Sequence, residues 1–493
     1  MGAAPSFETR TRWSNHLGDQ SVDPLRIYEP ETVDEVAEIV REAASGRVTV
    51  RAVGSGHSWS DVALTTGFLI QTGRLSRVPA PEPDFLRPGW GRRRLVRAEA
   101  GIRIKELNAY LDGRGLALSN MGGYDHQTVA GVISTSTHGS GMAFGPLNDF
   151  VRSLDLVAGD GRVHRIERAD GPTDPAAYQA RYGHRRTLVQ SDDWFDAAAV
   201  GMGCMGVVVT AMLEVEPSYF LREVRELRTW KQVRADLEAG EVLEGNRHYE
   251  LLFSPYQRRH SFPCLVTTRN VTEDPRHRPL DKRTRNWLVE LASLFPLTPH
   301  VINVAVGVRP SLAPFMLESA IRALIKDEYD NVSHQVLNIG AANVLPAYSA
   351  EIGVPMDGRH IAAVERLIEV AAEHRRLGAV YQSAPIAFRF VKASPAWMSM
   401  MYGRDTMMIE LIQLTRNQGG YELLAAYEQA LYDLGGRPHW GQVNTLTGSH
   451  GLVASMYPRH DDWLEVRRRL DPQGVFDSPF TRRVGISAER FSP

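Results

Sequence analysis

Residues 53–58, with the sequence Val-Gly-Ser-Gly-His-Ser, combine two glycines with a histidine and two hydroxyl side chains. They follow an apolar, β-branched run at 48–53, which predicts a short buried strand. Gly54 and Gly56 can adopt backbone conformations that other residues avoid, and loops of this kind direct backbone N–H groups at phosphate oxygens. The pattern indicates a phosphate-binding loop with His57 at its tip. A simple turn is the alternative, because short glycine motifs are weak indicators by themselves.

A second segment, at 120–145, is rich in Gly, Ser and Thr. Small side chains and hydroxyl groups can follow a polar ligand closely. A long flexible surface loop is the alternative. The apolar residues Val129, Val132 and Ile133 favour a buried segment instead.

Residues 201–206 spell Gly-x-Gly-x-x-Gly, which alone suggests a dinucleotide-binding fold. That fingerprint requires a strand before the glycines and a helix after them. Here residues 194–200 have a helical pattern and residues 207–215 form an apolar, β-branched run. The order is reversed, so the motif does not predict a Rossmann domain.

Two lone charges interrupt apolar strands late in the chain. Arg389 lies in the run Ile-Ala-Phe-Arg-Phe-Val, and Glu410 lies in Met-Met-Ile-Glu-Leu-Ile. A charge inside a buried strand requires a partner or a ligand. A structural salt bridge is therefore the alternative to a functional site. Glu410 could be either a base with a raised pKa or the partner of Arg389.

The glycine loop Gly-x-Gly-His-Ser at 54–58 has companions elsewhere: Val-Ala-Gly at 129–131, Thr-His-Gly-Ser-Gly at 137–141, Gly-Val-Val at 206–208 and His-Trp-Gly at 439–441. Together they resemble the vanillyl-alcohol-oxidase-type flavoproteins, especially the branch of aldonolactone oxidases and alditol oxidases. The resemblance spans nearly the whole chain. It implies an α+β fold with an FAD-binding domain of the PCMH type and a substrate cap of sheet and helices.

The resemblance also implies a set of FAD-binding residues, with the flavin joined covalently to His57. No cysteine lies at 122–141, where a second linkage would be expected, so a single attachment is predicted. The cofactor-binding residues are Val53, Gly54, Ser55, Gly56, His57, Ser58, Thr128, Gly131, Ser136, Thr137, His138, Gly139, Gly141, Gly203, Gly206, Val208, His439 and Gln442.

The substrate motifs are only half kept. The family's Glu-x-Arg strand retains Arg389 but has Ala387 in place of Glu, and Glu410 stands where alditol oxidases have His. Gln442 replaces a Lys that neutralises the flavin as it is reduced, so stabilisation of the reduced flavin should be weaker. We predict Arg389, Glu410, Gln442 and Ser136, which corresponds roughly to the reactive flavin edge, as catalytic residues. Glu351 matches a family strand and is predicted to be structural.

These matches imply oxidation of a CH–OH group to C=O with hydride transfer to flavin N5, and reoxidation by O2 to give H2O2. The substrate would be an alcohol, a polyol, a sugar lactone or a biosynthetic intermediate. The alternatives are a dehydrogenase with another acceptor and a flavin-holding protein with diverged chemistry. A serine hydrolase is disfavoured because no Gly-x-Ser-x-Gly elbow occurs. A metal site is not predicted, because zinc-binding spacings are missing.

Hydrophobic periodicity and polar composition predict the elements and domains. The domains are expected at 1–217 (FAD binding), 218–440 (cap) and 441–493 (return to the FAD domain). Exposed loops are predicted at 167–186 and 269–285. Helices are predicted at 32–44, 103–111, within 310–329, at 360–377 and from 463 to 471; strands are predicted at 95–99, 154–157, 163–166, 245–253 and 404–414, and a strand followed by the start of a helix at 384–401.

Composition sets the class of protein. The 493 residues carry a net charge of −2, which gives no electrostatic case for binding nucleic acid. Two cysteines form no disulfide framework, no secretory signal is evident and no apolar run has membrane-spanning length. A cytoplasmic location is predicted. Nearly all of the 56 basic residues are arginine, which indicates a GC-rich bacterial genome.

Overall fold

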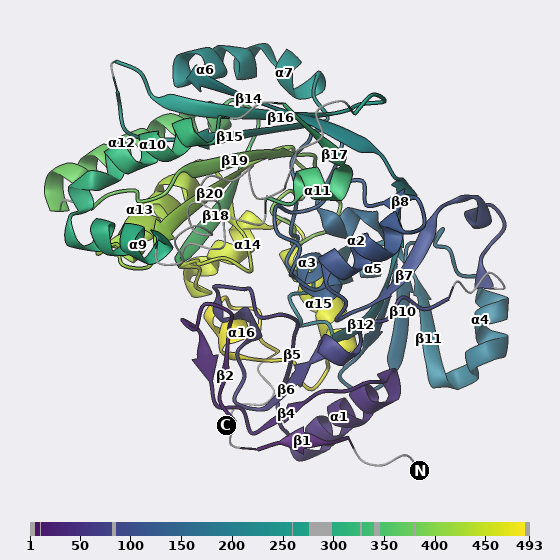
Figure 1. Ribbon diagram of the computed structural model, residues 1–493. Helices are drawn as coiled ribbons and strands as arrows, with labels where there is room; N and C mark the ends of the chain where they lie inside the picture. The colour runs from purple at the N-terminus through teal and green to yellow at the C-terminus, as the bar shows by residue number, and fades with distance from the viewer. Residues whose placement is uncertain are drawn as a thin grey trace.

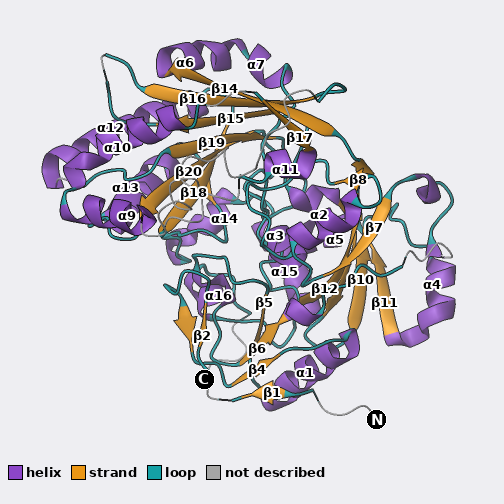
Figure 2. Cartoon of the chain, viewed as in Figure 1, coloured by secondary structure: helices purple, strands orange, loops and turns teal. Residues whose placement is uncertain are grey.

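A computed structural model of the protein describes residues 5–9, 11–80, 85–258, 260–275, 298–325, 328–339, 346–378 and 380–488. Figure 1 shows a large sheet across the top of the molecule and smaller sheets below it. Helices lie against these sheets in both parts (Figure 2). The fold is α+β with two domains, as the sequence predicts.

The first small sheet leads directly into the glycine loop. Its order is β1 (Phe7–Glu8), β4 (Arg26–Tyr28), β6 (Phe68–Gln71), β5 (Val50–Val53), and β4, β6 and β5 are parallel. Helix α1 (Val33–Gly46) begins at the Thr32 cap and packs Val36 and Val40 into the core beside this sheet. These elements confirm the helix predicted at 32–44 and the strand predicted at 48–53.

The second small sheet carries the other glycine-rich segments. It has the order β11 (Arg186–Gln190), β10 (Val163–Glu167), β9 (Val151–Val157), β12 (Val207–Glu214), β7 (Leu95–Glu99). The hairpin of β9 and β10 is confirmed. Helix α5 (Asp192–Ala198) precedes the glycines at 201–206 and β12 follows them, which confirms the reversed order. The helices α2 (Ile104–Asp112) and α3 (Val129–Ser134) complete this part.

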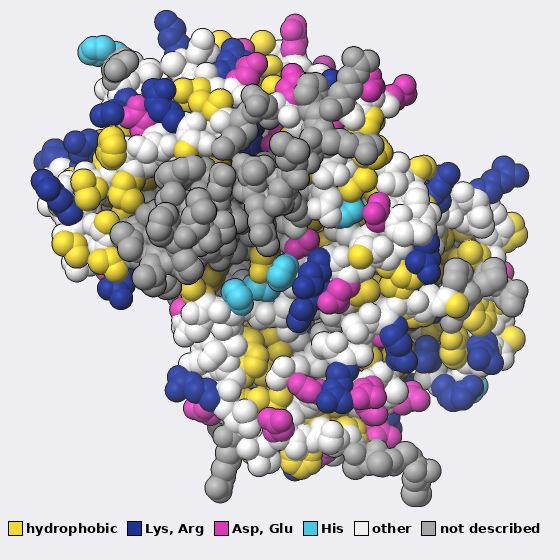
Figure 3. All heavy atoms as spheres, in the orientation of Figure 1, with side chains coloured by type: hydrophobic (Ala, Val, Ile, Leu, Met, Phe, Trp, Pro, Cys, Tyr) yellow, Lys and Arg dark blue, Asp and Glu magenta, His cyan; other side chains and the backbone are white. Residues whose placement is uncertain are grey.

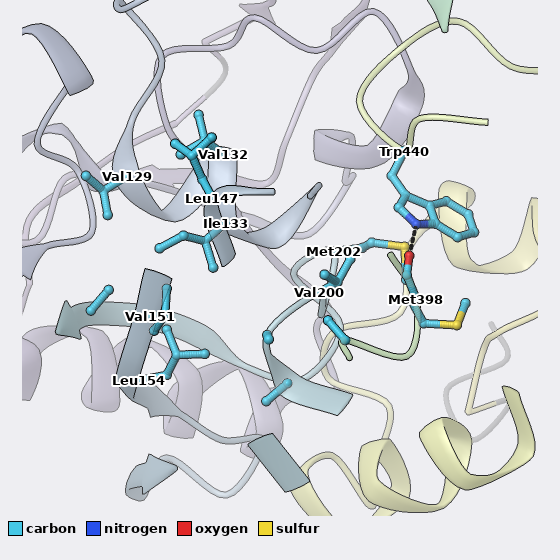
Figure 4. Close-up of a cluster of buried hydrophobic side chains, with 14 of the residues drawn as sticks. Val129, Val132, Ile133, Leu147, Val151, Leu154, Val200, Met202, Met398 and Trp440 are labelled. Carbon is cyan, nitrogen blue, oxygen red and sulfur yellow. Dashed lines mark hydrogen bonds between the residues drawn. The ribbon is translucent and has the colours of Figure 1, made fainter. Parts of the chain in front are cut away.

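The core of this domain recruits residues from the late part of the chain. Figure 4 shows Val129, Val132 and Ile133 of α3 in the same hydrophobic cluster as Met398 and Trp440. The indole N–H of Trp440 donates to the carbonyl of Met398 at 2.7 Å. The segments that follow the cap strands are thus anchored in the FAD-binding domain.

The large sheet forms the cap. Its order is β17 (Tyr329–Val332), β14 (Phe220–Thr229), β16 (Pro263–Val271), β15 (His248–Phe253), β19 (Ile386–Val391), β20 (Thr406–Leu414), β18 (Ala347–Pro355), β21 (Arg437–Pro438). The helices of this part are α6 (Trp230–Ala239), α7 (Glu241–Glu244), α9 (Thr298–Val308), α10 (Ala313–Ala323), α11 (Ser333–Leu337), α12 (Arg359–Gly378) and α13 (Gly420–Tyr432).

Strand alternation gives the cap sheet two different faces. On β19, Ile386, Phe388 and Phe390 pack in one cluster with residues of α6, α12 and α13. The intervening Ala387 and Arg389 line a cavity on the other face. We call this second face the inner face. Because side chains alternate along a strand, every second residue of the neighbouring strands also belongs to it.

The C-terminal segment returns to the FAD-binding domain. Helix α15 (His460–Leu470) packs beside α5, where the indole N–H of Trp463 donates to the carbonyl of Ala197 at 3.1 Å. Helices α14 (Leu452–Met456) and α16 (Pro479–Arg483) flank it along the chain, and Arg483 pairs with Asp61 at 2.6 Å. Short strand pairs join β2 (Trp13–Ser14) to β3 (Ser21–Val22) and β8 (Leu116–Ala117) to β13 (Glu216–Pro217).

The loop predicted at 167–186 is wrong for most of its length. Helix α4 (Pro175–Tyr182) occupies it, with Asp174 as its cap and Pro175 at its first turn. Glu167 is fully buried and accepts hydrogen bonds from the backbone and side chain of Thr173. Glu167 therefore has its partners inside the domain, whereas Asp170, Arg181 and Arg185 are exposed, as predicted for this segment.

Two further predictions about elements need correction, and a third is confirmed. Residues 269–271 belong to β16, and Arg269 is buried; residues 276–285 lie outside the described residues. The helix start predicted before Met401 is a series of turns, in which Ser394 and Ser399 hydroxyls accept backbone N–H groups. The helix predicted within 310–329 is α10, which ends at Ala323.

The surface has mixed charge. On the face shown in Figure 3, basic and acidic side chains are interspersed over both domains. No helix in the described ranges is long and apolar enough to cross a membrane. Both cysteines, Cys204 and Cys264, are buried and unpaired.

Candidate active site

Two adjoining cavities lie where the predicted motifs meet. The larger, of about 510 Å³, is bounded by the inner face of the cap sheet and by the loops of the FAD-binding domain. The smaller, of about 120 Å³, runs along the glycine loop. Both are lined by Gly56, His57, Ser58, Gln127 and Thr135. His57 therefore stands at the junction of the two cavities.

Close packing between backbone segments shapes the smaller cavity. A Cβ at Gly54 would lie 2.1 Å from the hydroxyl of Thr128, so only glycine permits the two segments to approach. The hydroxyl of Ser55 donates to the carbonyl of His126 at 2.8 Å. Buried Arg51 donates to the carbonyl of Met202 at 2.7 Å and thereby ties the third glycine motif to the first.

The residues of these cavities fit an FAD molecule. The narrow groove presents glycine backbone and hydroxyl side chains, which suit a pyrophosphate. The larger cavity has the volume of a site for an organic ring system. His57, Ser58 and Thr135 are shared by both, so one ligand can extend from the groove into the cavity.

Most of the predicted cofactor-binding residues line one of the two cavities. Val53, Gly54, Ser55, Gly56, His57, Ser58, Thr128, Gly131, Gly203, Gly206 and Val208 line the smaller, and Thr137, His138, His439 and Gln442 line the larger. Gly139 and Gly141 line neither. A Cβ at Gly139 would lie 2.1 Å from Asn120 Oδ1, and one at Gly141 would lie 2.2 Å from the carbonyl of Arg247. These glycines permit close packing behind the site.

Ser136 also lies outside both cavities. It is fully buried, and its hydroxyl contacts Asn148 at 3.0 Å and Ser399 at 2.8 Å. Its neighbours Thr135 and Thr137 line the cavity instead. The position of Ser136 therefore does not support contact with substrate, and we do not retain its predicted role.

His57 lies among aromatic rings. Its ring centroid is 4.9 Å from that of Tyr124, in an edge-to-face arrangement, and 4.5 Å from that of His16. Burial, with the nearby charges of His16, His126 and Arg103, lowers the pKa of His57 to about 4. The imidazole is therefore neutral at pH 7 and keeps a lone pair available for bonding.

Arg389 is the centre of a buried group of charges on the inner face. Its Nη1 lies 3.0 Å from Glu410 Oε2 and 3.6 Å from Glu351 Oε1, and its Nε lies 3.9 Å from Glu250 Oε1. Strand register brings these residues together, because Arg389 pairs with Glu250 and Glu410 pairs with Glu351. The lone charges predicted at Arg389 and Glu410 are thus partners, and both line the cavity.

Glu351 is not only structural, as predicted, but lines the same cavity. Its Oε1 lies 3.2 Å from Nε2 of His138, whose Nδ1 faces the carbonyl of Gly139 at 2.9 Å. A carbonyl only accepts, so Nδ1 is the donor in its contact with Gly139. Burial alone would raise the pKa of Glu351, but His138, His439 and Arg389 outweigh it and lower this pKa to about 2.

We expect Glu351→Gln to destabilise the protein by about 3–5 kcal/mol at pH 7, because His138 would lose its buried partner. The lowered pKa means that wild-type Glu351 contributes stability above its ordinary value of 4.5, and this contribution is lost as the pH falls through the range from 4.5 to about 2. The stability difference between wild type and variant should therefore shrink below pH 4.5. Chemical denaturation of both proteins between pH 7 and 3 measures it; a difference independent of pH would contradict the ion pair.

Gln442 is joined to the charged group through a hydroxyl. Ser349 Oγ lies 2.6 Å from Gln442 Oε1 and 3.4 Å from Glu410 Oε1. Burial raises the pKa of Glu410, although Arg389 opposes this. The pKa of Glu410 is therefore raised and the pKa of Glu351 is lowered, relative to their ordinary values. Such separation is typical of sites where one carboxyl group exchanges protons and the other stays ionised.

The group continues through residues that the sequence analysis missed. Glu250 pairs with Arg269 at 2.9 Å, and Arg269 pairs with Glu223 at 2.7 Å. Glu250 is the only carboxylate or guanidinium in β15, which is the same signal that identified Arg389, so this signal, applied to every strand, finds Glu250. Arg269 stands beside Thr268 and Asn270 in a segment predicted as a loop, and Glu223 is one of several charges in β14, so the signal does not find these two residues.

His439 completes the polar end of the cavity. Its Nδ1 accepts the backbone N–H of Gly441 at 3.0 Å, and burial lowers its pKa to about 4. The neutral ring therefore carries its proton on Nε2. The backbone N–H of Trp59 donates to the carbonyl of Gly441 at 2.8 Å, which holds this segment against the glycine loop.

Comparison with known proteins agrees with this geometry. The family model for D-arabinono-1,4-lactone oxidase matches residues 211–484, and a model for an FAD-binding domain matches residues 24–167. L-gulono-1,4-lactone dehydrogenase of Mycobacterium tuberculosis is 30% identical over 478 residues, which cover 96% of this chain and 98% of that protein. Alditol oxidase of a Streptomyces species is 27% identical over 476 residues, covering 96% of this chain and 98% of that protein.

The fold has close counterparts among solved structures. A solvent-stable cholesterol oxidase superposes with a TM-score of 0.78 over 98% of this chain and 99% of that chain, at 17% identity. This likeness shows the fold alone, and it confirms the predicted PCMH-type architecture. With the two matched family models, it follows that the chain belongs to the D-arabinono-1,4-lactone oxidase family and is an FAD-dependent oxidoreductase that acts on CH–OH groups.

Proposed function

We propose that this protein oxidises a secondary CH–OH group of a neutral hydroxylated substrate to C=O, at the inner face of the cap. One observation carries the proposal: the half-buried Arg389–Glu410 pair lines a cavity that opens onto the His57 loop. FAD bound in these cavities would supply the acceptor for the hydride equivalent of the carbinol carbon. Arg389 binds the substrate oxygen, and Glu410 receives the hydroxyl proton.

The charges around the cavity support a neutral substrate. Arg389 is paired with Glu410, and Arg269 with Glu250, so these side chains compensate one another without a ligand. A carboxylate or phosphate group on the substrate would disturb this balance at a buried site. The named activities of the relatives support a hydroxylated lactone or an alcohol.

The first test of this function is anaerobic mixing of the purified yellow protein with hydroxylated lactones and alcohols. Bleaching of the flavin absorbance by at least one class is the expected result. A flavin that is photoreduced normally but is bleached by none of these compounds would favour the diverged, non-redox alternative.

Covalent attachment of FAD through His57 is proposed because the neutral, buried imidazole stands at the junction of the cavities. In wild type, flavin fluorescence is expected to stay with the protein after acid precipitation. His57→Ala should release all of its flavin into the supernatant. His16→Ala, which removes the neighbouring ring, is the matched control and should keep the covalent label. Complete release from the wild type would refute the linkage and leave the fold unchanged.

Molecular oxygen is proposed as the electron acceptor, giving H2O2. The named dehydrogenase among the relatives makes another acceptor the alternative. Mixing the substrate-reduced protein with air-saturated buffer separates the two. Reoxidation by air that is faster than the reduction of the flavin by substrate supports oxygen as the acceptor. Slower reoxidation supports a dehydrogenase that uses a different acceptor.

Gln442→Lys is expected to raise the reduction potential of the flavin, because a cation would stand where negative charge develops on reduction. Ser349 links this position to Glu410, so the new ammonium should also lower the pKa of Glu410. Potentiometric titration measures the reduction potential. The fall in the rate of flavin reduction at low pH reports the pKa of Glu410. Gln442→Met, which adds no charge, is the control and should neither raise the reduction potential nor lower the pKa of Glu410.

The domain boundaries at 217 and 440 and the cytoplasmic location stay predictions. The boundary at 217 is supported by the end of β13 at Pro217 and the start of the cap sheet at Phe220.

A further inference from the structure

One row of inner-face residues crosses the cap sheet from an apolar side to a charged side. Strand register aligns Leu265 with Leu252, Leu252 with Ala387, Ala387 with Glu410, and Glu410 with Glu351. Each of these residues lines the larger cavity. The carboxylates therefore stand at one end of the row, and aliphatic side chains stand at the other.

The aliphatic end is incompletely packed. Leu252 and Ile412 are half-buried, whereas their neighbours on the outer face, Leu251 and Leu411, are at most 2% exposed. Leu324, at the end of α10, is also half-buried and lines the same cavity. Apolar side chains inside a protein normally contact other side chains on all sides. Leu265 and Leu414 line the cavity beside them but are themselves at most 2% exposed. We call Leu252, Leu265, Leu324, Ile412 and Leu414 the apolar wall.

A charged group beside this wall, the guanidinium of Arg225, is already engaged. Arg225 pairs with Glu223 at 2.8 Å and donates to the carbonyl of Leu324 at 3.2 Å. Ala387 adds a methyl group to the row. A substrate hydroxyl placed on the wall would lose hydrogen bonds to water without gaining equivalent partners. An alkyl group placed there would instead cover exposed apolar surface.

We infer that the substrate is amphipathic: it presents its CH–OH group to Arg389 and Glu410 and lays an apolar chain or ring against the apolar wall. The inference rests on the proposed function for the location of the reacting carbon. It names a substrate class, a neutral hydroxylactone or alcohol with an alkyl substituent, in preference to a fully hydroxylated sugar lactone. The wall comes wholly from the cap, whereas the predicted cofactor loops come from the FAD-binding domain.

The test uses binding and turnover separately. Flavin-loaded protein is titrated with 5-alkyl-γ-butyrolactones that lack a hydroxyl group, and binding is followed by the change in flavin absorbance. Affinity should rise about fourfold for each methylene added, until the cavity is filled. L-gulono-1,4-lactone, titrated anaerobically, should bind more weakly than the longer alkyl lactones. Affinity independent of chain length, or tighter binding of the sugar lactone, would overturn the inference.

Two isosteric variants locate the effect. Ile412→Thr places a hydroxyl group on the wall and should weaken binding of the longest lactone about tenfold relative to Ile412→Val, with the shortest lactone unaffected. Equal affinities for the two variants would remove Ile412 from the site. The corresponding 2-hydroxylactones are then mixed anaerobically. If the affinity gradient is present but none of them bleaches the flavin, the proposed oxidation fails while the apolar wall stands.

Discussion

Replacing Glu410 by glutamine is expected to slow reduction of the flavin by substrate about 10²–10⁴-fold, which is the usual contribution of a general base. Glutamine keeps the size of the side chain and cannot accept the hydroxyl proton. Burial raises the pKa of Glu410, so in wild type the rate should fall as the pH drops towards this pKa, at a pH above 4.5. Anaerobic stopped-flow reduction between pH 5 and 9 measures both the rate and this acid limb, which Glu410→Gln should lack.

Glu428→Gln is the matched control for this substitution. Glu428 is also a buried carboxylate whose pKa is raised by burial, but it accepts the backbone N–H of Thr445 and the hydroxyl of Tyr432 outside the cavity. This variant is expected to keep the wild-type rate and acid limb. Wild-type behaviour in Glu410→Gln would move the proton transfer elsewhere, and the Glu351–His138 pair would be the next candidate.

Short motifs predicted many of the residues that line the two cavities, because such motifs depend on local backbone. Gly54 and Gly56 lie in the loop that directly follows β5, so a few neighbouring residues are enough to identify this loop in the sequence. Arg389 and Glu410 were also identifiable, because a charge in an apolar strand conflicts with its surroundings. Their pairing depends on β19 and β20 being neighbours in the sheet, which a local sequence pattern does not reveal.

The partners that the sequence did not predict depend on long-range contacts. Glu351 meets His138 only because the cap sheet closes over the FAD-binding domain. Ser136 illustrates a local failure: α3 ends at Ser134, and Ser136 has a positive φ of 58°, which turns its side chain into the core. The side chain of Ser136 therefore lies in the core, although its neighbours Thr135 and Thr137 line the cavity.

Substituting Arg389 by methionine is expected to lower the stability of the protein by about 3–5 kcal/mol at pH 8. Three carboxylates lie close to this guanidinium, Glu351 buried and Glu250 and Glu410 half-buried, and methionine would leave them without its charge. The loss should diminish as the pH falls, because protonated carboxyl groups need no counter-charge. Reduction of the flavin should also slow, since the substrate oxygen would lose its donor. Chemical denaturation between pH 5 and 8 and stopped-flow reduction measure the two effects.

A second substitution separates charge balance from catalysis. Arg389→Met combined with Glu410→Gln removes one uncompensated charge, so it should recover part of the stability and none of the rate. Arg165→Met is the control for a buried arginine remote from the cavity, because Arg165 pairs with Asp155 at 2.7 Å within the second small sheet. It should lower stability and leave the rate of flavin reduction unchanged. If Arg389→Met retained the wild-type rate, the guanidinium would serve the fold alone, and the substrate oxygen would have to be bound by another donor of the cavity, with His439 Nε2 the first to test.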